Sequence, residues 1–366
     1  MTSVSLNNIS GKDKSSKVAD AIREMALTKG PGWKLPTVVE MCRSLNVAFG
    51  TLDVALDTLA LQGVIERKRG SGIYVSASIH QKTIGVVFGG DIFSPGFSPF
   101  WSLLLQAVRQ QVSERKMRLR AYFDILEEHE GLGGHTQLVE DLEARRLEGL
   151  LLLSPHFEYD EAKQLRSTGV PLVVFSDSDT GWAVTHDHDQ FIRLAALELA
   201  TVGVRRMGLL GPPNYRSTLE NEFCQTGYGD IRVEDWSYET WAWIIPGAGT
   251  YENCAYRLTQ RMIADAASTP LPNALISMED TSTRGVVMAL REAGLYPGRD
   301  IRIITSANKG SPVLEPYAAD LTRIEFDTAD SVRTALDMLK TLMDGGTPPH
   351  NPVLIGPKVV ATVTHP

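Results

Sequence analysis

The stretch from Gly63 to Val75 constrains the fold of this chain more than any other. It reads Gly-Val-Ile-Glu-Arg-Lys-Arg-Gly-Ser-Gly-Ile-Tyr-Val. Two short apolar runs on either side of a basic, glycine-bearing centre predict two strands joined by a hairpin. Gly70 and Gly72 allow the tip to bend and to approach another molecule closely. The hairpin directly follows a helix-turn-helix pattern, and the two together predict a winged helix.

Three predicted helices precede the hairpin. Apolar residues at helical spacing mark the first, over residues 15–29. Thr37 and Glu40 form a capping box, which predicts a second helix over about 37–45. The third is expected over about 49–62, with an inward face formed by Leu52, Ala55, Leu56 and Leu59.

A helix, a short turn and another helix form the arrangement that lays the later helix in the major groove of DNA. In the hairpin, we expect Arg67, Lys68 and Arg69 to contact phosphates. The sequence therefore predicts a domain that binds double-stranded DNA over residues 15–76. A disordered tail is expected at 1–14 and a short linker at 77–82.

These residues resemble the winged helix of the GntR family of regulators. The resemblance rests on Lys34-Leu35-Pro36-Thr37, Leu45-Asn46-Val47, Thr51-Leu52, Ala55-Leu56, Leu59, Gly63-Val64-Ile65 and Gly70-Ser71-Gly72-Ile73-Tyr74-Val75. Taken with the hairpin, it implies DNA contacts from Lys34, Thr37, Phe49, Thr51, Arg67, Lys68, Arg69, Gly70, Ser71 and Gly72.

The chain departs from the family pattern at three places. Ala48-Phe49 stands where the family usually has Ser-Arg, Val39 where it often has Arg, and Asp53 where it often has Arg or Lys. Loss of the serine cap costs roughly 1 kcal/mol of helix stability. Loss of the arginine removes a phosphate or base contact, and an exposed Asp53 would repel phosphates. A second hypothesis is therefore a ligand-binding protein whose winged helix has lost DNA binding and serves dimerisation or partner contact.

Charge is distributed unevenly along the 366 residues. The net charge is -8, yet residues 1–80 contain 10 Lys and Arg against 7 Asp and Glu, so the remainder is strongly acidic. This balance fits a DNA reader joined to a body that stays off DNA. The three cysteines lack metal-ligand spacing, and the chain has no signal-peptide pattern or 18-residue apolar run. We expect a cytoplasmic protein with free thiols and no membrane partner.

From Thr83 onward, short apolar runs alternate with helical stretches. The runs at 84–88, 119–123, 149–153 and 172–175 are of buried-strand type, and a second series follows a helix at about 190–202. This alternation predicts βαβ units with parallel sheets, arranged as two successive lobes.

Residues 83–366 resemble the effector domain of the LacI/GalR family, a relative of periplasmic sugar-binding proteins. The resemblance rests on Thr83–Val87, Arg146–Leu150, Gly169–Val174, Gly203–Leu210, Pro272–Asp280 and Leu290–Leu295. The implied α/β fold is an N-terminal winged helix-turn-helix followed by a two-lobed, doubly wound, periplasmic-binding-protein-like domain. That domain would dimerise and hold a small-molecule effector, such as a sugar or related metabolite.

Ligands of open α/β sheets bind at the carboxyl ends of strands. The loop after the first strand of the body supplies Asp91, Phe97, Phe100 and Trp101, whose rings could stack on a sugar or pack the lobe. Later strand ends, together with the resemblance, add Ser176, Asp187, Arg216, Asp280, Asn308 and Phe326. Two carboxylates that usually bind sugar in the family are replaced by Ser176 and by Ala307-Asn308, so ordinary hexoses should bind poorly.

The sequence contains no catalytic or metal-binding motif of a familiar kind. His186-Asp187-His188-Asp189 has the composition of a metal cluster, but we interpret it as a polar strand at the edge of the cleft. An enzyme built on the body is a third hypothesis, disfavoured because no nucleophile-base pair appears. We expect no catalytic site, no metal and no cofactor.

The prediction is a ligand-responsive, repressor-type transcription regulator that binds a pseudo-palindromic operator as a homodimer. Ligand-driven closure of the lobes would change the affinity for the operator, a coupling typically of about 1–3 kcal/mol.

Overall fold

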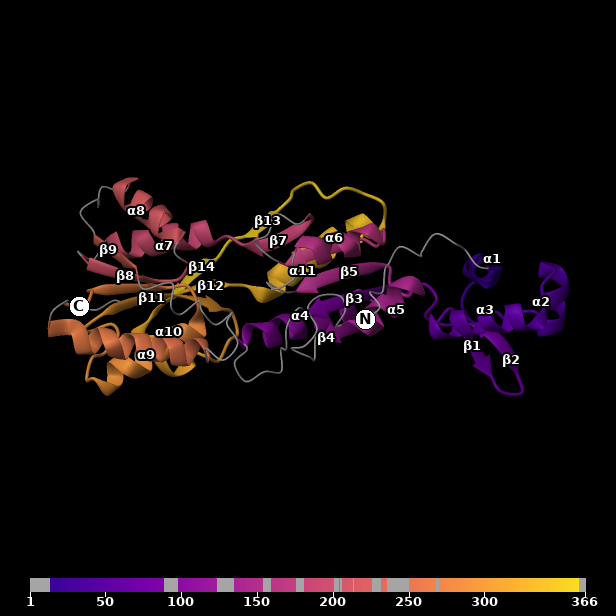
Figure 1. Cartoon of the computed structure of the whole chain (residues 1–366), viewed down its shortest axis with the longest axis horizontal. Coiled ribbons are helices and arrows are strands. Elements are labelled where there is room, and N and C mark those ends of the chain that lie inside the picture. The colour runs from indigo at the N-terminus through magenta and orange to yellow at the C-terminus, as the bar shows by residue number, and fades with distance from the viewer. Residues whose placement is uncertain are drawn as a thin grey trace, which may run out of the picture. The chain divides into compact units, whose positions relative to one another are not determined.

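The computed structural model describes residues 14–88, 98–123, 135–153, 159–175, 181–200, 204, 206–212, 214–225, 232–235, 250–267 and 270–361. The first of these ranges opens with three helices and a two-stranded sheet, namely α1 (Lys14–Lys29), α2 (Val38–Leu45), α3 (Phe49–Leu61), β1 (Ile65–Lys68) and β2 (Gly72–Val75). Figure 1 shows α3 beside the β1–β2 hairpin in the indigo part of the ribbon. The predicted winged helix is confirmed.

The turn between α2 and α3 is set by local caps. The Thr37 side chain accepts a hydrogen bond from the Glu40 backbone N–H, and the Glu40 carboxylate accepts one from the Thr37 N–H at 2.7 Å. Asn46 ends α2 in the left-handed conformation, with φ 51°. Ala48 at the N-cap of α3 forms no side-chain cap hydrogen bond, as expected where serine is missing.

The hairpin is antiparallel, with Ile65 opposite Val75 and Lys68 opposite Gly72. Gly70 has φ 74° and Gly72 has φ 124°, conformations that favour glycine. Ile65 and Val75 are buried and pack with the apolar face of α3 in one core. The hairpin is therefore held against the helix that precedes it.

Two six-stranded sheets form the rest of the fold. The first has the order β13-β7-β6-β5-β3-β4, from β3 (Thr83–Phe88), β4 (Arg118–Phe123), β5 (Gly149–Leu153), β6 (Leu172–Phe175), β7 (Ala183–His186) and β13 (Val353–Ile355). The second has the order β14-β12-β11-β10-β8-β9, from β8 (Arg206–Leu210), β9 (Arg232–Asp235), β10 (Ala274–Ser277), β11 (Arg302–Asn308), β12 (Thr322–Phe326) and β14 (Lys358–Ala361). β14 runs antiparallel to β12, whereas the other pairings that the described residues define here are parallel.

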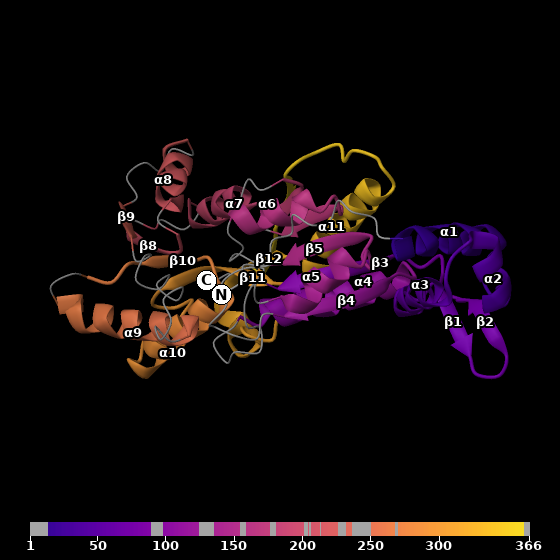
Figure 2. The ribbon, with the colours of Figure 1, turned by 45° about the vertical axis from the view of Figure 1, so that its right-hand side comes forward.

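Helices connect these strands, as the alternation in sequence predicts. They are α4 (Phe100–Glu114), α5 (Thr136–Glu143), α6 (Tyr159–Ser167), α7 (His188–Ala200), α8 (Tyr215–Gln225), α9 (Tyr251–Ala264), α10 (Asp280–Glu292) and α11 (Thr328–Met343), with 3-10 helices η4 (Asp265–Ala267) and η5 (Glu315–Asp320). Figures 1 and 2 both show α9 and α10 side by side. They touch at Gly285, where an added Cβ would lie 2.1 Å from the backbone oxygen of Glu252.

The chain packs into two compact units. The first comprises Met1–Gly89, Val112–Leu172 and Leu342–Gly346, and the second comprises Gly90–Gln111, Val173–Thr341 and Thr347–Pro366. The winged helix thus shares its unit with β3, β4, α5 and β5. Within the described residues, no single helix is long and apolar enough to cross a membrane, although α2 and α3, bent by 110°, pass that test as a pair.

Three local expectations are corrected. His186 ends β7 and His188 begins α7, so the interpretation of residues 186–189 as one strand is wrong. The Asp187 carboxylate explains the break, because it accepts a hydrogen bond from the Gln190 N–H at 2.8 Å in the first turn of α7. Arg216, expected in a loop, lies in α8. Strand β9 was not expected, because its sequence Arg-Val-Glu-Asp has no apolar run.

Candidate DNA-binding surface and ligand pocket

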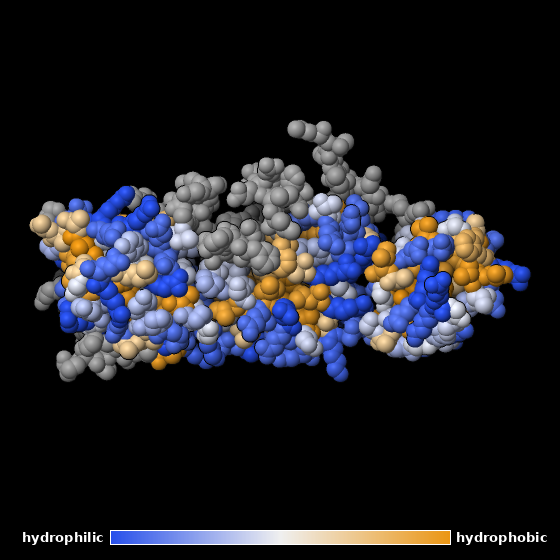
Figure 3. Space-filling view, turned by 90° about the horizontal axis from the view of Figure 1, so that it is seen from below, coloured by the Kyte–Doolittle hydropathy of each residue, from blue (hydrophilic) through white to orange (hydrophobic). Residues whose placement is uncertain are grey.

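The exposed face formed by α2 and α3 is more apolar than is usual for a surface that binds DNA. Val39 on α2 is 59% exposed, and Phe49 and Val54 on α3 are 64% and 55% exposed. The sequence of α3, Phe-Gly-Thr-Leu-Asp-Val-Ala-Leu-Asp-Thr-Leu-Ala-Leu, contains no basic residue. Figure 3 shows apolar surface on this domain, at the right of the view. Any side-chain contact from α3 to a base therefore has to come from an apolar, hydroxyl or carboxylate group.

Arg67 is engaged with the helix beside it. Its guanidinium lies 3.2 Å from a carboxylate oxygen of Asp53 and 3.0 Å from one of Asp57, one turn further along α3. The sequence alone predicts a phosphate ligand at Arg67 and a repulsive charge at Asp53. The two side chains instead neutralise one another in the free protein, and Asp57 was missed as a partner because sequence spacing does not reveal contact between a strand and a helix.

Cations surround an aromatic ring at the wing. The ammonium groups of Lys34 and Lys68 lie 5.7 Å and 5.0 Å from the centroid of the Tyr74 ring. The Tyr74 hydroxyl is 2.8 Å from that of Ser71, and this hydrogen bond, with help from the two lysines, lowers the pKa of Tyr74. The lack of a side chain at Gly72 leaves room for Lys34, since an added Cβ would lie 2.8 Å from the Lys34 Cε.

The other predicted DNA contacts have varied surroundings. Arg69 and Gly70 are exposed at the hairpin tip, and Thr51 is half-buried on α3. Thr37 is exposed, but its side chain is occupied by the capping box, and Glu40 has a lowered pKa because of the backbone and side-chain hydrogen bonds from Thr37. In the described part of the chain, Lys34, Lys68 and Arg69 are thus the predicted cations that form no ion pair with a carboxylate.

The C-terminal end of α3 contacts the body within the first unit. Gln62 donates to the backbone oxygen of Ala144, just after α5, and accepts from Arg23 of α1. Arg118 of β4 donates to the Ser78 oxygen at 3.2 Å. The Arg118 guanidinium also lies against Gly63, where an added Cβ would be 2.2 Å from its Nη1. The winged helix therefore meets its neighbour through side chains as well as through the linker.

An aromatic cluster gathers three predicted effector residues in the second unit. The Phe326 ring stacks on His186 with centroids 4.1 Å apart, and Phe100 lies edge-on to His186 at 5.8 Å and to Trp101 at 5.2 Å. Burial, together with the nearby His188, lowers the pKa of His186 to about 3, so its imidazole is neutral at physiological pH. The cluster is uncharged, and its Phe326 ring is 0% exposed and belongs to the hydrophobic core of this unit.

Two further predicted residues line a cavity of about 240 Å³ in the same unit. Asp280, at the first position of α10, and Asn308, at the end of β11, both face it, and the rest of the lining is Ala307, Gly310, Ser311, Leu314, Glu315, Arg323, Glu325 and Val360. Asp280 is 2% exposed, and neither carboxylate oxygen has a hydrogen-bond partner among the described residues.

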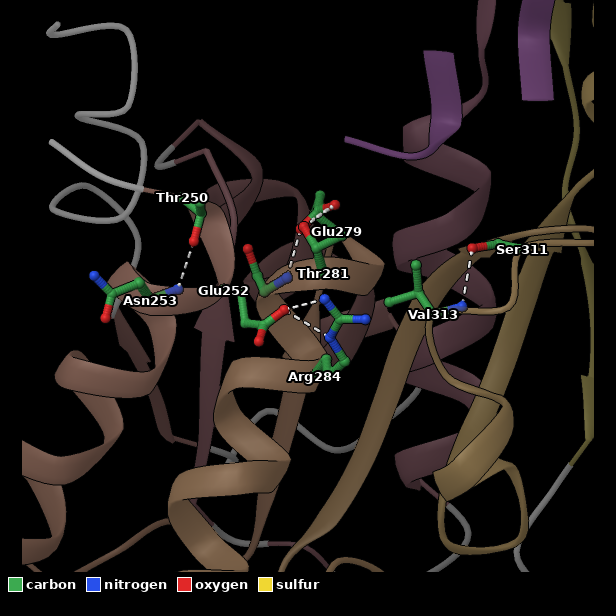
Figure 4. Close-up of polar contacts among 9 residues, drawn as sticks. Thr250, Glu252, Asn253, Glu279, Thr281, Arg284, Ser311 and Val313 are labelled. Atoms are coloured by element: carbon green, nitrogen blue, oxygen red, sulfur yellow. Dashed lines mark hydrogen bonds and ion pairs between the residues drawn. The ribbon is translucent and has the colours of Figure 1, made fainter. Parts of the chain in front are cut away.

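The carboxylate of Glu279, next to Asp280, accepts hydrogen bonds from its neighbours in α10. Glu279 caps α10 by accepting from the Ser282 N–H at 2.6 Å, and it accepts from the Thr281 hydroxyl at 2.6 Å. Figure 4 shows these contacts, with the Glu252–Arg284 pair below them and the Ser311 hydroxyl directed to the Val313 N–H. Burial and the charge of Asp280 raise the pKa of Glu279 to about 7.

The remaining predicted effector residues have other partners or cannot be placed. Asp187 caps α7, and Arg216 forms an exposed pair with Glu220 at 2.9 Å. Asp91, Phe97 and Ser176 lie outside the described residues. In the described part of the chain, no group of three or more His, Cys, Asp and Glu side chains could hold a metal ion.

Family models match two parts of the chain. Residues 14–75 match the bacterial regulatory proteins of the gntR family, and residues 196–362 match a periplasmic binding protein-like domain. No curated protein sequence matches the chain.

Solved structures share the fold of about three quarters of the chain. A LacI family transcriptional regulator from Arthrobacter sp. FB24 in complex with lactose gives a TM-score of 0.60 at 15% identity, covering 77% of this chain and 98% of that one. The lac repressor dimer bound to operator and the anti-inducer ONPF gives 0.59 at 18%, covering 77% and 93%. The transcription regulator CcpA of Lactococcus lactis gives 0.58 at 15%, covering 77% and 98%. At these identities the likeness is one of fold.

Proposed function

Because the chain joins a GntR-family DNA-binding domain to a periplasmic binding protein-like domain, we propose that it is a repressor that binds a pseudo-palindromic operator as a dimer and responds to a small molecule. The two matched domains support a ligand-responsive transcription regulator in preference to an enzyme. Repression, dimeric binding to an operator, a small metabolite as effector and a cytoplasmic location belong to the proposal.

The observation that carries the proposal is that α3 packs beside a β-hairpin that bears positively charged side chains. α3 is the second helix of a helix-turn-helix, the element that enters the major groove in this class of domain. Lys68 and Arg69 lie on the hairpin beside it and Lys34 lies next to Tyr74, so three cations are available to phosphates. We expect the wing tip at Gly70-Ser71-Gly72 to contact the adjacent minor groove.

Because α3 contains no arginine, we expect it to recognise bases without the Arg-guanine contact that is commonest in the major groove. Phe49 and Val54 project from α3 and can contact the C5-methyl group of thymine, and the Thr51 hydroxyl can bond to a base edge. We therefore expect an A·T-rich half-site, because thymine methyl groups are the apolar feature of the major groove.

Dimerisation through the effector domains would space two winged helices about one helical turn of DNA apart or a multiple of it. The lac repressor structure noted above is a dimer on its operator, which supports this arrangement as a precedent for the fold. A ligand in the second domain would act on operator affinity through the linker and through the Gln62 and Arg118 contacts.

A second candidate function is a ligand-binding protein whose winged helix contacts another protein. The absence of any basic residue from α3, together with exposed Val39, Phe49 and Val54, favours it. Apolar exposure of this kind is typical of protein interfaces as well as of thymine contacts.

Selection from a pool of random duplexes separates the two functions. The purified full chain, at low salt, should enrich a site with two related half-sites. A matched variant with Lys68→Ala and Arg69→Ala should enrich none while keeping its thermal stability, since both side chains are exposed. Failure of the unaltered protein to enrich any sequence would reject the regulator proposal in favour of the second candidate.

A further inference from the structure

The cavity at Asp280 contains a buried charge that the fold does not satisfy. Buried carboxylates normally accept several hydrogen bonds, and an unpartnered one costs several kcal/mol. Asp280 is only 2% exposed, yet neither of its carboxylate oxygens has a hydrogen-bond partner among the described residues. Its place at the start of α10 favours a negative charge through the helix dipole, but the dipole supplies no donor atom here.

The charges around the cavity have an acidic excess. Three carboxylates line it, from Asp280, Glu315 and Glu325, against the single guanidinium of Arg323. That guanidinium is shared between Glu315 at 3.6 Å and Glu325 at 3.4 Å, so Asp280 is left uncompensated. The Arg323 Nε is buried without a partner and offers one donor to a hydrogen-bond acceptor.

The volume of the cavity and the polar groups that line it limit the class of molecule that can bind there. A volume of about 240 Å³ lies below the roughly 300–1,000 Å³ typical of sites for drug-sized molecules, so the occupant is small. The described residues do not group three metal ligands, which disfavours a metal ion. A neutral polyol could donate to Asp280 but would leave its charge buried and uncompensated, whereas an ammonium group supplies up to three donors and the opposite charge.

We propose that this cavity binds a small organic ammonium ion whose charged group sits on Asp280 and whose hydroxyl or carbonyl oxygen accepts from Arg323. Binding requires nothing of the DNA-binding domain. The role of such an ion as the effector rests on the proposed function.

The neighbouring Glu279 supports a cation on independent grounds. Two adjacent carboxylates, one capping α10 and one facing the cavity, repel each other in a poorly solvated setting, which raises the pKa of Glu279. An ammonium ion at Asp280 would relieve this repulsion. Its binding should therefore release protons near neutral pH, a signal that a neutral ligand would not produce.

Matched pairs of probes test the proposal on the full chain without DNA. Ethanolamine is paired with ethylene glycol, and 4-amino-1-butanol and putrescine are paired with 1,4-butanediol. Calorimetric titration and thermal unfolding should show saturable binding of at least one amine. Its diol counterpart, and D-glucose, should bind at least tenfold more weakly. Absence of binding by all three amines, or equal binding of an amine and its diol, would overturn the proposal.

Two variants localise the effect. Asp280→Asn preserves shape and removes the charge, so it should fold normally and weaken amine binding about tenfold or more. Asp330→Asn removes an exposed carboxylate of the same unit that pairs with Arg333, and it should leave amine binding unchanged. Retained affinity in Asp280→Asn would place any bound amine elsewhere and refute the site. An amine that binds as predicted but leaves duplex binding unchanged would confirm the site and reject its role as effector, independently of the duplex selection.

Discussion

Arg67 offers the sharpest test of how this winged helix uses charge. If it contacted a phosphate directly, Arg67→Ala would reduce the slope of log K against log salt concentration by about 0.9, the value for one released counterion. Its pairing with Asp53 and Asp57 predicts a much smaller change of slope. Lys68→Ala, which removes a cation that stacks on Tyr74, should give the full reduction.

The affinity should nevertheless fall in Arg67→Ala, because two carboxylates lose their partner beside the DNA. Because one guanidinium balances only one of the two carboxylate charges, its removal adds one uncompensated negative charge; at about 7 Å from a phosphate in water this costs roughly 0.6 kcal/mol, about a threefold loss of affinity. Asp53→Asn with Asp57→Asn in the Arg67→Ala background should restore most of it. The folding stability should change by about 1 kcal/mol or less, since exposed pairs contribute little.

Fluorescence anisotropy of a labelled duplex enriched by selection, measured over a salt series, gives both quantities. Lys82→Ala is the charge-matched control, because Lys82 pairs with Asp344 in the body, 2.5 Å away. A slope reduced by about 0.9 in Arg67→Ala, without rescue by the two asparagines, would show that Arg67 leaves its carboxylates to bind phosphate and would contradict the predicted neutralisation by Asp53 and Asp57.

Further predictions concern the body and the helices. The raised pKa of Glu279 means that its contribution to stability is complete below the unfolded value near 4.5 and is lost as pH rises through about 7. Glu279→Gln should remove about 2 kcal/mol of pH dependence, after allowance for partial solvent screening, in denaturant titrations across that window. For Asp141, burial raises the pKa, but hydrogen bonds from Tyr122, Arg120 and Arg146 lower it further than burial raises it. Its contribution is therefore present above pH 4 and lost on acidification, and Asp141→Asn should cost about 3–5 kcal/mol at neutral pH by leaving buried donors unpaired. Gly285→Ala should destabilise the fold by about 1–3 kcal/mol through contact with α9, whereas Gly50→Ala on α3, with no heavy atom within 4 Å of the added Cβ, should stabilise it by up to about 1 kcal/mol. Thermal unfolding measures both glycine variants, and the same sign for the two would contradict the packing described here.

The parts of the fold that sequence predicts well are those set by neighbours along the chain. Three features depend on residues close together in the sequence, and the structure confirms each of them. They are the capping box at Thr37 and Glu40, the apolar face of α3 and the glycine-bearing hairpin. The alternating strands and helices of the body were recovered for the same reason. The break at Asp187 was missed because both a polar strand and a capped helix start fit His-Asp-His-Asp.

The candidate sites depend on contacts between distant segments, which a single sequence does not reveal. Asp53 looked like an isolated repulsive charge, yet it lies against Arg67 of the following strand. The family resemblance points to Asp280, but its buried, unpartnered state and its neighbours Glu315, Arg323 and Glu325 depend on the packing of β12 beside β11.

The proposed function requires that this chain distinguishes one duplex sequence from another. The equilibrium affinity of the full chain for the selected duplex is therefore compared with its affinity for a scrambled duplex of equal length, at about 0.15 M salt. The proposed function predicts that the selected duplex binds at least about a thousandfold more tightly, the lower end for specific regulators. Equal affinities for the two duplexes would contradict it.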